Sequence, residues 1–244
     1  MDNYTAEQRA ILQAASYFMP KGAWVAGGAL TSVYTGQSIN DVDIYFKDRA
    51  SFEEAVRGAY DDGLWCVAKT SRAVTFAYGN SIVQMMHFNW FSDPAAIFDS
   101  FDFTCCMAAM DCETKDIIMH GDFLKHASQR FLKFHSGTAF PFGTVARVLK
   151  YQKRGYTIGV NEMLRIALKC STVPISSWDD LKEQIGGQYG EAVIIAGEGD
   201  FSVDAAISAM NSMEIKSSKP DIMPGNAEAL ILSIFGDITT SEAI

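Results

Sequence analysis

The spacing of hydrophobic residues changes its period several times along the first 90 residues of the chain. Apolar residues three and four positions apart predict amphipathic helices, whereas short apolar or alternating runs predict strands. By this rule the helices span residues 5–19, 29–35 and 51–61, and the strands span residues 23–26, 42–46, 65–69, 73–77 and 82–88. Thr5 and Gln8 form a capping-box pattern at the first helix, and Gly79-Asn80 predicts a hairpin turn between the last two strands.

The remainder of the chain has a mainly helical pattern. Asp93 and Pro94 begin a short helix to Asp99, and residues 111–119 resemble a short hairpin. Further helices are predicted at residues 142–155, 161–170, 177–185, 203–213 and 227–235, with a loop at 217–226. This order predicts an α+β fold. Residues 1–125 would form a head domain with a mixed or antiparallel sheet and flanking helices, and residues 126–244 a small helical neck and C-terminal domain.

The segment GGALTSVYTGQSINDVD, residues 27–43, carries the most informative chemistry. Gly27 and Gly28 close a strand, so the backbone there can turn sharply and approach a ligand. In the following strand Asp41 and Asp43 share one face, with carboxylates roughly 6 to 7 Å apart. Two hard oxygen ligands at this spacing suit Mg²⁺, which would bridge the oxygens of a nucleoside triphosphate. The segment therefore predicts a phosphate and metal site.

The same segment resembles a family signature. A double glycine, twelve residues and an Asp-x-Asp is the head signature of the CCA-adding enzyme and bacterial poly(A) polymerase branch of the DNA polymerase β-like nucleotidyltransferases. FDFTCCMAAMD, residues 101–111, is similar to the family's Arg-Arg-Asp-Phe-Thr-x-Asn-Ala segment, and ARVLKYQKRGYTI, residues 146–158, is similar to its neck helix. The resemblance covers roughly residues 20–170 and implies the polymerase β-like head fold.

The resemblance also implies roles for individual residues. Asp41 and Asp43 correspond to the catalytic metal ligands, for Mg²⁺ or Mn²⁺, and Gly27 and Gly28 to the turn against the triphosphate. Asp102 is the best candidate for a third catalytic carboxylate, with Asp99 second, although a helix N-cap would explain Asp102 nearly as well. The strand at 82–88 carries no acid and offers only Gln84 and His87.

Several family positions hold other residues here. The paired arginines before Asp102 are replaced by Ser100 and Phe101, and the family Asn is Cys106. In place of the family's Glu-Asp-x-x-Arg, which reads the incoming base, stand Phe140, Pro141 and Thr144. The chain is then either a divergent, phage-like member with its own specificity or a member that has lost turnover.

The net charge of −9 conceals one basic region. Residues 126–170 hold eight lysines and arginines against the single acid Glu162. Arg147, Lys150 and Arg154 fall at i, i+3 and i+7, so one helix face presents three cations, which suits a triphosphate or an RNA backbone. A solvated helix with extended side chains is the alternative. Lys69 and Arg72 could also reach the triphosphate or could simply face solvent.

Composition sets outer limits on the protein. A chain of 244 residues with 48% hydrophobic content can bury a substantial core. No signal peptide and no apolar run near 18 residues are present, which predicts a soluble cytoplasmic protein without a membrane partner. The five cysteines lack framework or zinc-site spacing, so reduced thiols packed in the core are favoured.

We therefore expect a metal-dependent nucleotidyltransferase that transfers a nucleoside monophosphate from a nucleoside triphosphate to an acceptor hydroxyl and releases pyrophosphate. By resemblance alone the preferred acceptor is an RNA 3′ end, which implies binding of a nucleotide such as ATP and a role in RNA processing. Two alternatives stay open: transfer to a protein or small molecule, and a non-catalytic nucleotide or RNA binding module.

Overall fold

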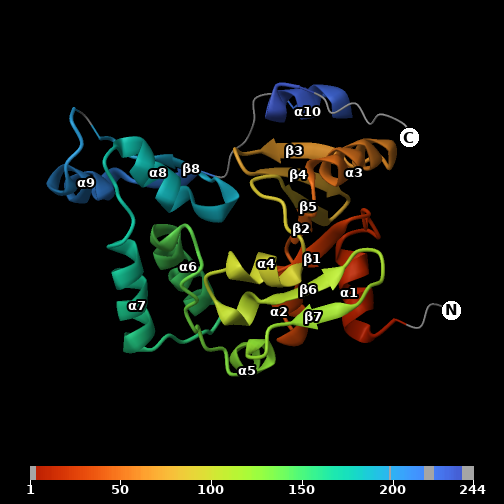
Figure 1. Cartoon of the computed structure of the whole chain (residues 1–244), viewed down its shortest axis with the longest axis horizontal. Coiled ribbons are helices and arrows are strands. Elements are labelled where there is room, and N and C mark those ends of the chain that lie inside the picture. The colour runs from red at the N-terminus through yellow and green to blue at the C-terminus, as the bar shows by residue number, and fades with distance from the viewer. Residues whose placement is uncertain (1–3, 198, 217–222, 238–244) are drawn as a thin grey trace.

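The computed structural model describes residues 4–197, 199–216 and 223–237 (Figure 1). Within this part of the chain, seven strands form one mixed sheet in the order β3-β4-β5-β2-β1-β6-β7. Only β2 and β5 pair in parallel among these strands, and the other neighbours are antiparallel. The strands are β1 (Ala23–Ala26), β2 (Val42–Phe46), β3 (Trp65–Lys69), β4 (Ala73–Tyr78), β5 (Ser81–Met86), β6 (Ala108–Asp111) and β7 (Ile117–Met119).

Helices flank this sheet and make up most of the rest of the molecule (Figure 1). The α+β prediction is thus confirmed, including the mixed sheet. The helices are α1 (Ala6–Ala14), α2 (Gly28–Tyr34), α3 (Arg49–Asp61), α4 (Pro94–Asp99), α5 (Phe123–Ser128), α6 (Pro141–Lys153), α7 (Val160–Cys170), α8 (Trp178–Gly186), α9 (Val203–Ala209) and α10 (Ala227–Phe235). None of the helices in the described residues is long and apolar enough to cross a membrane.

Local capping chemistry sets several element boundaries. Thr5 and Gln8 form the predicted capping box at α1. The helix ends before Met19, where the hydrophobic pattern had placed its end, because Ser16 and Tyr17 adopt positive φ and turn the chain. Asp93 caps α4 through a hydrogen bond from the Ala96 amide.

The C-terminal region differs from the all-helical prediction. Strands β8 (Ala192–Ile194) and β9 (Glu214–Lys216) pair antiparallel between α8 and the segment that leads to α10. Helix α9 also ends earlier than predicted, and a 3₁₀ turn (Met210–Ser212) continues it. The short apolar run at 192–195 gave no strand prediction because its partner strand lies about twenty residues later in the chain. The loop prediction for 217–226 falls mostly outside the described residues.

Within the described part of the chain, buried side chains form two hydrophobic cores. The main core joins buried side chains of the sheet to side chains of α6, α7 and α10, such as Tyr151, Ile166 and Leu230. A smaller core brings Leu181 of α8 together with Val193 of β8. The main core therefore crosses residue 125, the predicted boundary between head and helical domains, and that boundary remains a prediction.

Helix α10 returns from the C-terminal region to pack on α3 (Figure 1). Phe235 packs edge-on against Phe52, and Arg57 pairs with Glu228. Lys69 also reaches α10, where its Nζ donates to the carbonyl and hydroxyl oxygens of Ser233. The last described helix thus covers the α3 and β3 side of the sheet.

His87 predicts a pH dependence of stability. It lies among Phe52 and Phe235, and burial lowers its pKa from 6.5 to about 4. Because the unfolded state takes up a proton that the folded state resists, stability is lost as the pH falls from 6.5 toward 4. From the pKa shift we expect a loss of about 2 to 3 kcal/mol between pH 7.5 and 4.5. Urea unfolding of wild type and of His87→Phe at both pH values measures how much of the lost unfolding free energy depends on His87. Equal pH dependence of the unfolding free energy in the two proteins would contradict this prediction.

Candidate functional site

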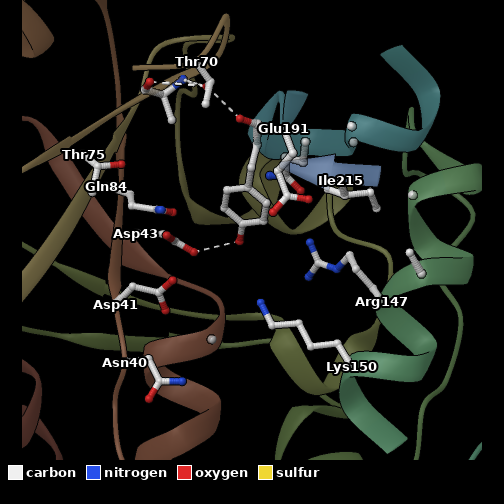
Figure 2. A pocket seen from close by; sticks show the side chains of 18 of the residues that line it. Asn40, Asp41, Asp43, Thr70, Thr75, Gln84, Arg147, Lys150, Glu191 and Ile215 are labelled. Atoms are coloured by element: carbon white, nitrogen blue, oxygen red, sulfur yellow. Dashed lines mark hydrogen bonds between the residues drawn. The ribbon is translucent and has the colours of Figure 1, made fainter. Parts of the chain in front are cut away.

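A cavity of about 380 Å³ lies between the sheet, helix α6 and residues 185–191 (Figure 2). The sheet contributes Asp43 of β2, Thr75 of β4 and Gln84 of β5, and α6 contributes Arg147 and Lys150. Figure 2 shows Lys150 and Arg147 extending from α6 toward the carboxylates of Asp41 and Asp43. Segments far apart in the sequence thus enclose one polar space.

The two carboxylates enter the cavity from the start of β2. Asp43 is only 5% exposed, and its Oδ1 has no hydrogen-bond partner within the described residues. Burial and the neighbouring Asp41 raise the pKa of Asp43 to about 7. A buried carboxylate with a free oxygen beside a second carboxylate is a set of hard ligands that a divalent cation would satisfy. These two residues therefore fit a divalent cation such as Mg²⁺ or Mn²⁺, although the described residues hold no cluster of three or more His, Cys, Asp or Glu ligands.

The double glycine lies beside this pair. Gly27 has φ +85°, a conformation that favours glycine, and an added Cβ would lie 3.5 Å from the Phe101 ring and 4.0 Å from Asp43 Oδ2. Its amide donates to the Ala108 carbonyl, so that N–H holds β6 and is not available for a phosphate. Gly28 lines the cavity, and no atom lies within 4 Å of an added Cβ there. The backbone at Gly28 is therefore open to the cavity.

Three cations on α6 and at its C-cap line the same cavity as the carboxylates. Arg147, Lys150 and Arg154 all line the cavity, as their helical spacing predicts. Arg147 is held in place by Asp102, whose Oδ2 lies 2.9 Å from the arginine Nε. Although burial opposes its charge, the Asp102 carboxylate raises the pKa of Arg147 well above its usual value. Arg147 is therefore a fixed positive charge at the cavity.

Asp102 occupies a different position from the one expected of a third metal carboxylate. It is buried, it does not line the cavity, and it pairs with Arg147. It is not a helix N-cap either, because the adjoining 3₁₀ turn is capped at Phe103. In the register of the parallel β2–β5 pair, the neutral residue Gln84 of β5 is the neighbour of Asp43. Asp102 therefore positions the Arg147 side chain. The strand that pairs with β2 beside Asp43 carries the side-chain amide of Gln84 instead of a third carboxylate.

Lys69 and Arg72, which the sequence offered as possible triphosphate ligands, lie outside the cavity. Neither lines the cavity, and Lys69 bonds to Ser233 of α10. Arg72 pairs with Glu183 and donates to the Gly187 carbonyl, and its guanidinium lies 3.9 Å from the centre of the Phe140 ring. Both side chains tie the sheet to the C-terminal region, a long-range role that a local sequence pattern does not reveal.

Residues 186–191 are a wall of the site that sequence reasoning missed. They carry the sequence GGQYGE and include a 3₁₀ turn (Gly187–Tyr189). Tyr189 Oη donates to Asp43 Oδ2 at 2.8 Å, which is the dashed line that reaches Asp43 in Figure 2. The three glycines were the available signal, since Gly187 and Gly190 both take positive φ. Their position beyond the resembling region kept them out of the prediction.

Solved structures define the class of fold. The chain superposes on a CCA-adding enzyme in its apo form with a TM-score of 0.53, at 15% identity over 72% of this chain and 45% of that chain. It also superposes on the Thermotoga maritima CCA-adding enzyme complexed with tRNA, with a TM-score of 0.50, at 14% identity over 84% and 49%. The chain therefore has the nucleotidyltransferase fold of CCA-adding enzymes and spans about half their length.

The sequence family is narrower than the fold. The model of the Gabija anti-defense 2 family matches residues 3–130, more than half of the chain, and the chain belongs to that family. A relative, Gabija anti-defense 2 of Bacillus phage SPbetaL7, is 44% identical over 168 residues. This alignment covers 69% of the chain and 42% of the relative, so the chain spans less than half of that protein.

Proposed function

We propose that the protein is a metal-dependent nucleotidyltransferase, a divergent relative of the CCA-adding enzyme and poly(A) polymerase branch. The observation that carries this proposal is the cavity in which Asp41 and Asp43 face Arg147 and Lys150. Carboxylates would bind the divalent cation, and the lysine and arginine side chains would bind the negatively charged triphosphate, so both kinds of charge are needed in one cavity. The nucleotidyltransferase fold supports the same reading.

The residues of the site would have two separate roles in the transfer reaction, metal binding and triphosphate binding. Asp41 and Asp43 would hold Mg²⁺, which when bound neutralises charge on the phosphates. Lys150, Arg154 and the oriented Arg147 would bind the triphosphate and align its α-phosphate with an acceptor hydroxyl. The acceptor oxygen would bond to the α-phosphorus and release its proton to solvent. The bond between the α-phosphorus and the oxygen that bridges to the β-phosphate would break, and pyrophosphate would leave. Positioning and charge supply most of the rate enhancement, since the metal-holding carboxylates and the phosphate-binding cations form no covalent bond with the substrate.

The biological role follows from the family. The relative from Bacillus phage SPbetaL7 is named for action against Gabija defence, and we extend that role to this chain. The transferred nucleotide would then modify a component on which the defence depends, in the cytoplasm where nucleoside triphosphates are available. The fold and the basic face of α6 favour an RNA 3′ end as the acceptor. A protein or small-molecule acceptor is the alternative.

The test is a transfer assay. The protein is incubated with each α-labelled nucleoside triphosphate, Mg²⁺ and either total RNA or defence proteins, and we expect pyrophosphate release with label on an acceptor. Lys150→Met is expected to weaken use of the triphosphate by about tenfold, because one charge contact is worth roughly 1 to 2 kcal/mol. Lys153→Met, an exposed lysine of the same helix, is the matched control. Nucleotide binding without any transfer would instead establish a non-catalytic binding module.

A further inference from the structure

The hydroxyl of Tyr189 lies in the cavity, next to the carboxylate pair. It donates to Asp43 Oδ2 at 2.8 Å, directly on one of the two carboxylates proposed to hold the metal. The Arg147 guanidinium lies 5.7 Å from the centre of the Tyr189 ring. The chain thus brings one of its own hydroxyls to the carboxylate pair.

The backbone around Tyr189 is held on several sides. Thr70 Oγ1 donates to the Tyr189 carbonyl at 2.7 Å, and Arg72 donates to the Gly187 carbonyl at 3.2 Å. Gln188 Nε2 donates to the Tyr45 hydroxyl at 3.2 Å. Gly190 has φ +63°, and a Cβ there would lie 2.7 Å from Ser71 Oγ, so this position favours glycine. These contacts of residues 187–190 therefore hold the Tyr189 ring in its position in the cavity.

The hydroxyls of two other tyrosines and of Thr70 bond to groups other than Asp43. The Tyr151 hydroxyl lies 2.7 Å from Cys106 Sγ, and Thr70 is committed to the Tyr189 carbonyl. The Tyr45 hydroxyl is buried and accepts from Gln188. Among the residues that the structure describes, Tyr189 is the one whose hydroxyl donates a hydrogen bond to Asp43. This singles it out from every other tyrosine near the site.

We propose that Tyr189 is a nucleotidyl acceptor, so that the protein transfers a nucleoside monophosphate to its own Tyr189 Oη. This inference rests on the proposed nucleotidyltransferase function. The Tyr189 oxygen bonds to the α-phosphorus and the bond from that phosphorus to the β-phosphate oxygen breaks. The phenolic proton is released to solvent, and pyrophosphate leaves with the oxygen that bridged the α- and β-phosphates. The product is a tyrosyl phosphodiester with one nucleotide per chain, held in the cavity beside Lys150 and Arg147.

The experiment maps the modification directly. Wild-type protein is incubated with each nucleoside triphosphate and Mg²⁺, its intact mass is measured, and the modified peptide is sequenced by tandem mass spectrometry. We expect a mass increase of one nucleoside monophosphate, located on Tyr189. Tyr189→Phe is expected to lose the adduct, whereas Tyr78→Phe, which removes a half-exposed tyrosine in the β4 to β5 hairpin, is expected to keep it. Nucleotide binding by Tyr189→Phe, measured by equilibrium dialysis, establishes that its site is intact.

The possible failures are distinguishable. Label that reaches RNA or an added protein while wild-type Tyr189 stays unmodified would overturn this inference and leave the proposed function standing. An adduct on a different residue would also overturn it. Absence of pyrophosphate release and of label on every acceptor would overturn both the inference and the proposed function.

Discussion

Asp43→Asn is expected to abolish nucleotidyl transfer, with a loss of about a thousandfold or more. The substitution keeps the shape of the side chain and removes the charge that would hold the divalent cation beside the phosphates. Loss of several kcal/mol of charge stabilisation in the transition state corresponds to such a factor. The measurement is the rate of pyrophosphate release with saturating nucleoside triphosphate and Mg²⁺. Asp61→Asn, at an exposed carboxylate on α3, is the matched control and is expected to keep wild-type activity.

The same variant also separates catalysis from folding. Because burial and Asp41 raise the pKa of Asp43 to about 7, a negative charge at this position opposes folding of the metal-free protein. Above that pKa, Asp43→Asn is therefore expected to unfold at the same temperature as wild type or higher, in the absence of Mg²⁺. Added Mg²⁺ is expected to stabilise wild type more than the variant. Wild-type activity in Asp43→Asn would contradict the assignment of Asp43 as a metal ligand.

Removal of either member of the Arg147 and Asp102 pair is expected to destabilise the fold. Asp102 is 5% exposed and Arg147 is 24% exposed, so the loss of one partner leaves a largely buried charge without its counterion. We expect Arg147→Met to cost about 2 to 4 kcal/mol of unfolding free energy, somewhat below the value for a fully buried pair because Arg147 retains contact with solvent. Urea unfolding measures the change, and Lys153→Met on the exposed face of α6 is the control.

A double-mutant cycle tests whether the two residues act together. If Asp102 serves to orient Arg147, the double variant Arg147→Met with Asp102→Asn is expected to be less destabilised than the sum of the single variants. Asp102→Asn alone is expected to raise the KM for the nucleoside triphosphate more than it lowers kcat, because Arg147 loses its fixed position. Strict additivity of the two stability effects would contradict this role for Asp102.

Local patterns predicted most of the sheet and several caps correctly. β1, β2 and β3 agree with their predicted ranges, because their apolar runs are short and bounded by turn residues. The caps at Thr5 and Asp93 are sequence-local hydrogen bonds, so neighbouring residues suffice to identify them. The strands β8 and β9 were missed because each is three residues long and is defined by its pairing with a distant partner.

Local sequence patterns likewise predicted some residues of the site but not others. The pairing of Asp41 with Asp43 and the face formed by Arg147, Lys150 and Arg154 follow from strand and helix periods, and all five residues line the cavity. Asp102 shows the limit of that reasoning. Its position in the chain was compatible with a metal ligand, yet its partner is an arginine 45 residues later.

By itself, the sequence determined the α+β class, the two carboxylates at the start of one strand and the row of three cations along one helix and its C-cap. These features depend on interactions among near neighbours in the chain, and each has a fixed period. Only the tertiary structure decided which groups meet. It placed Asp102 against Arg147, turned Lys69 and Arg72 toward the C-terminal helices, and set Tyr189 on Asp43, 146 residues earlier. Such contacts arise from the packing of distant segments, for which the local pattern carries no signal.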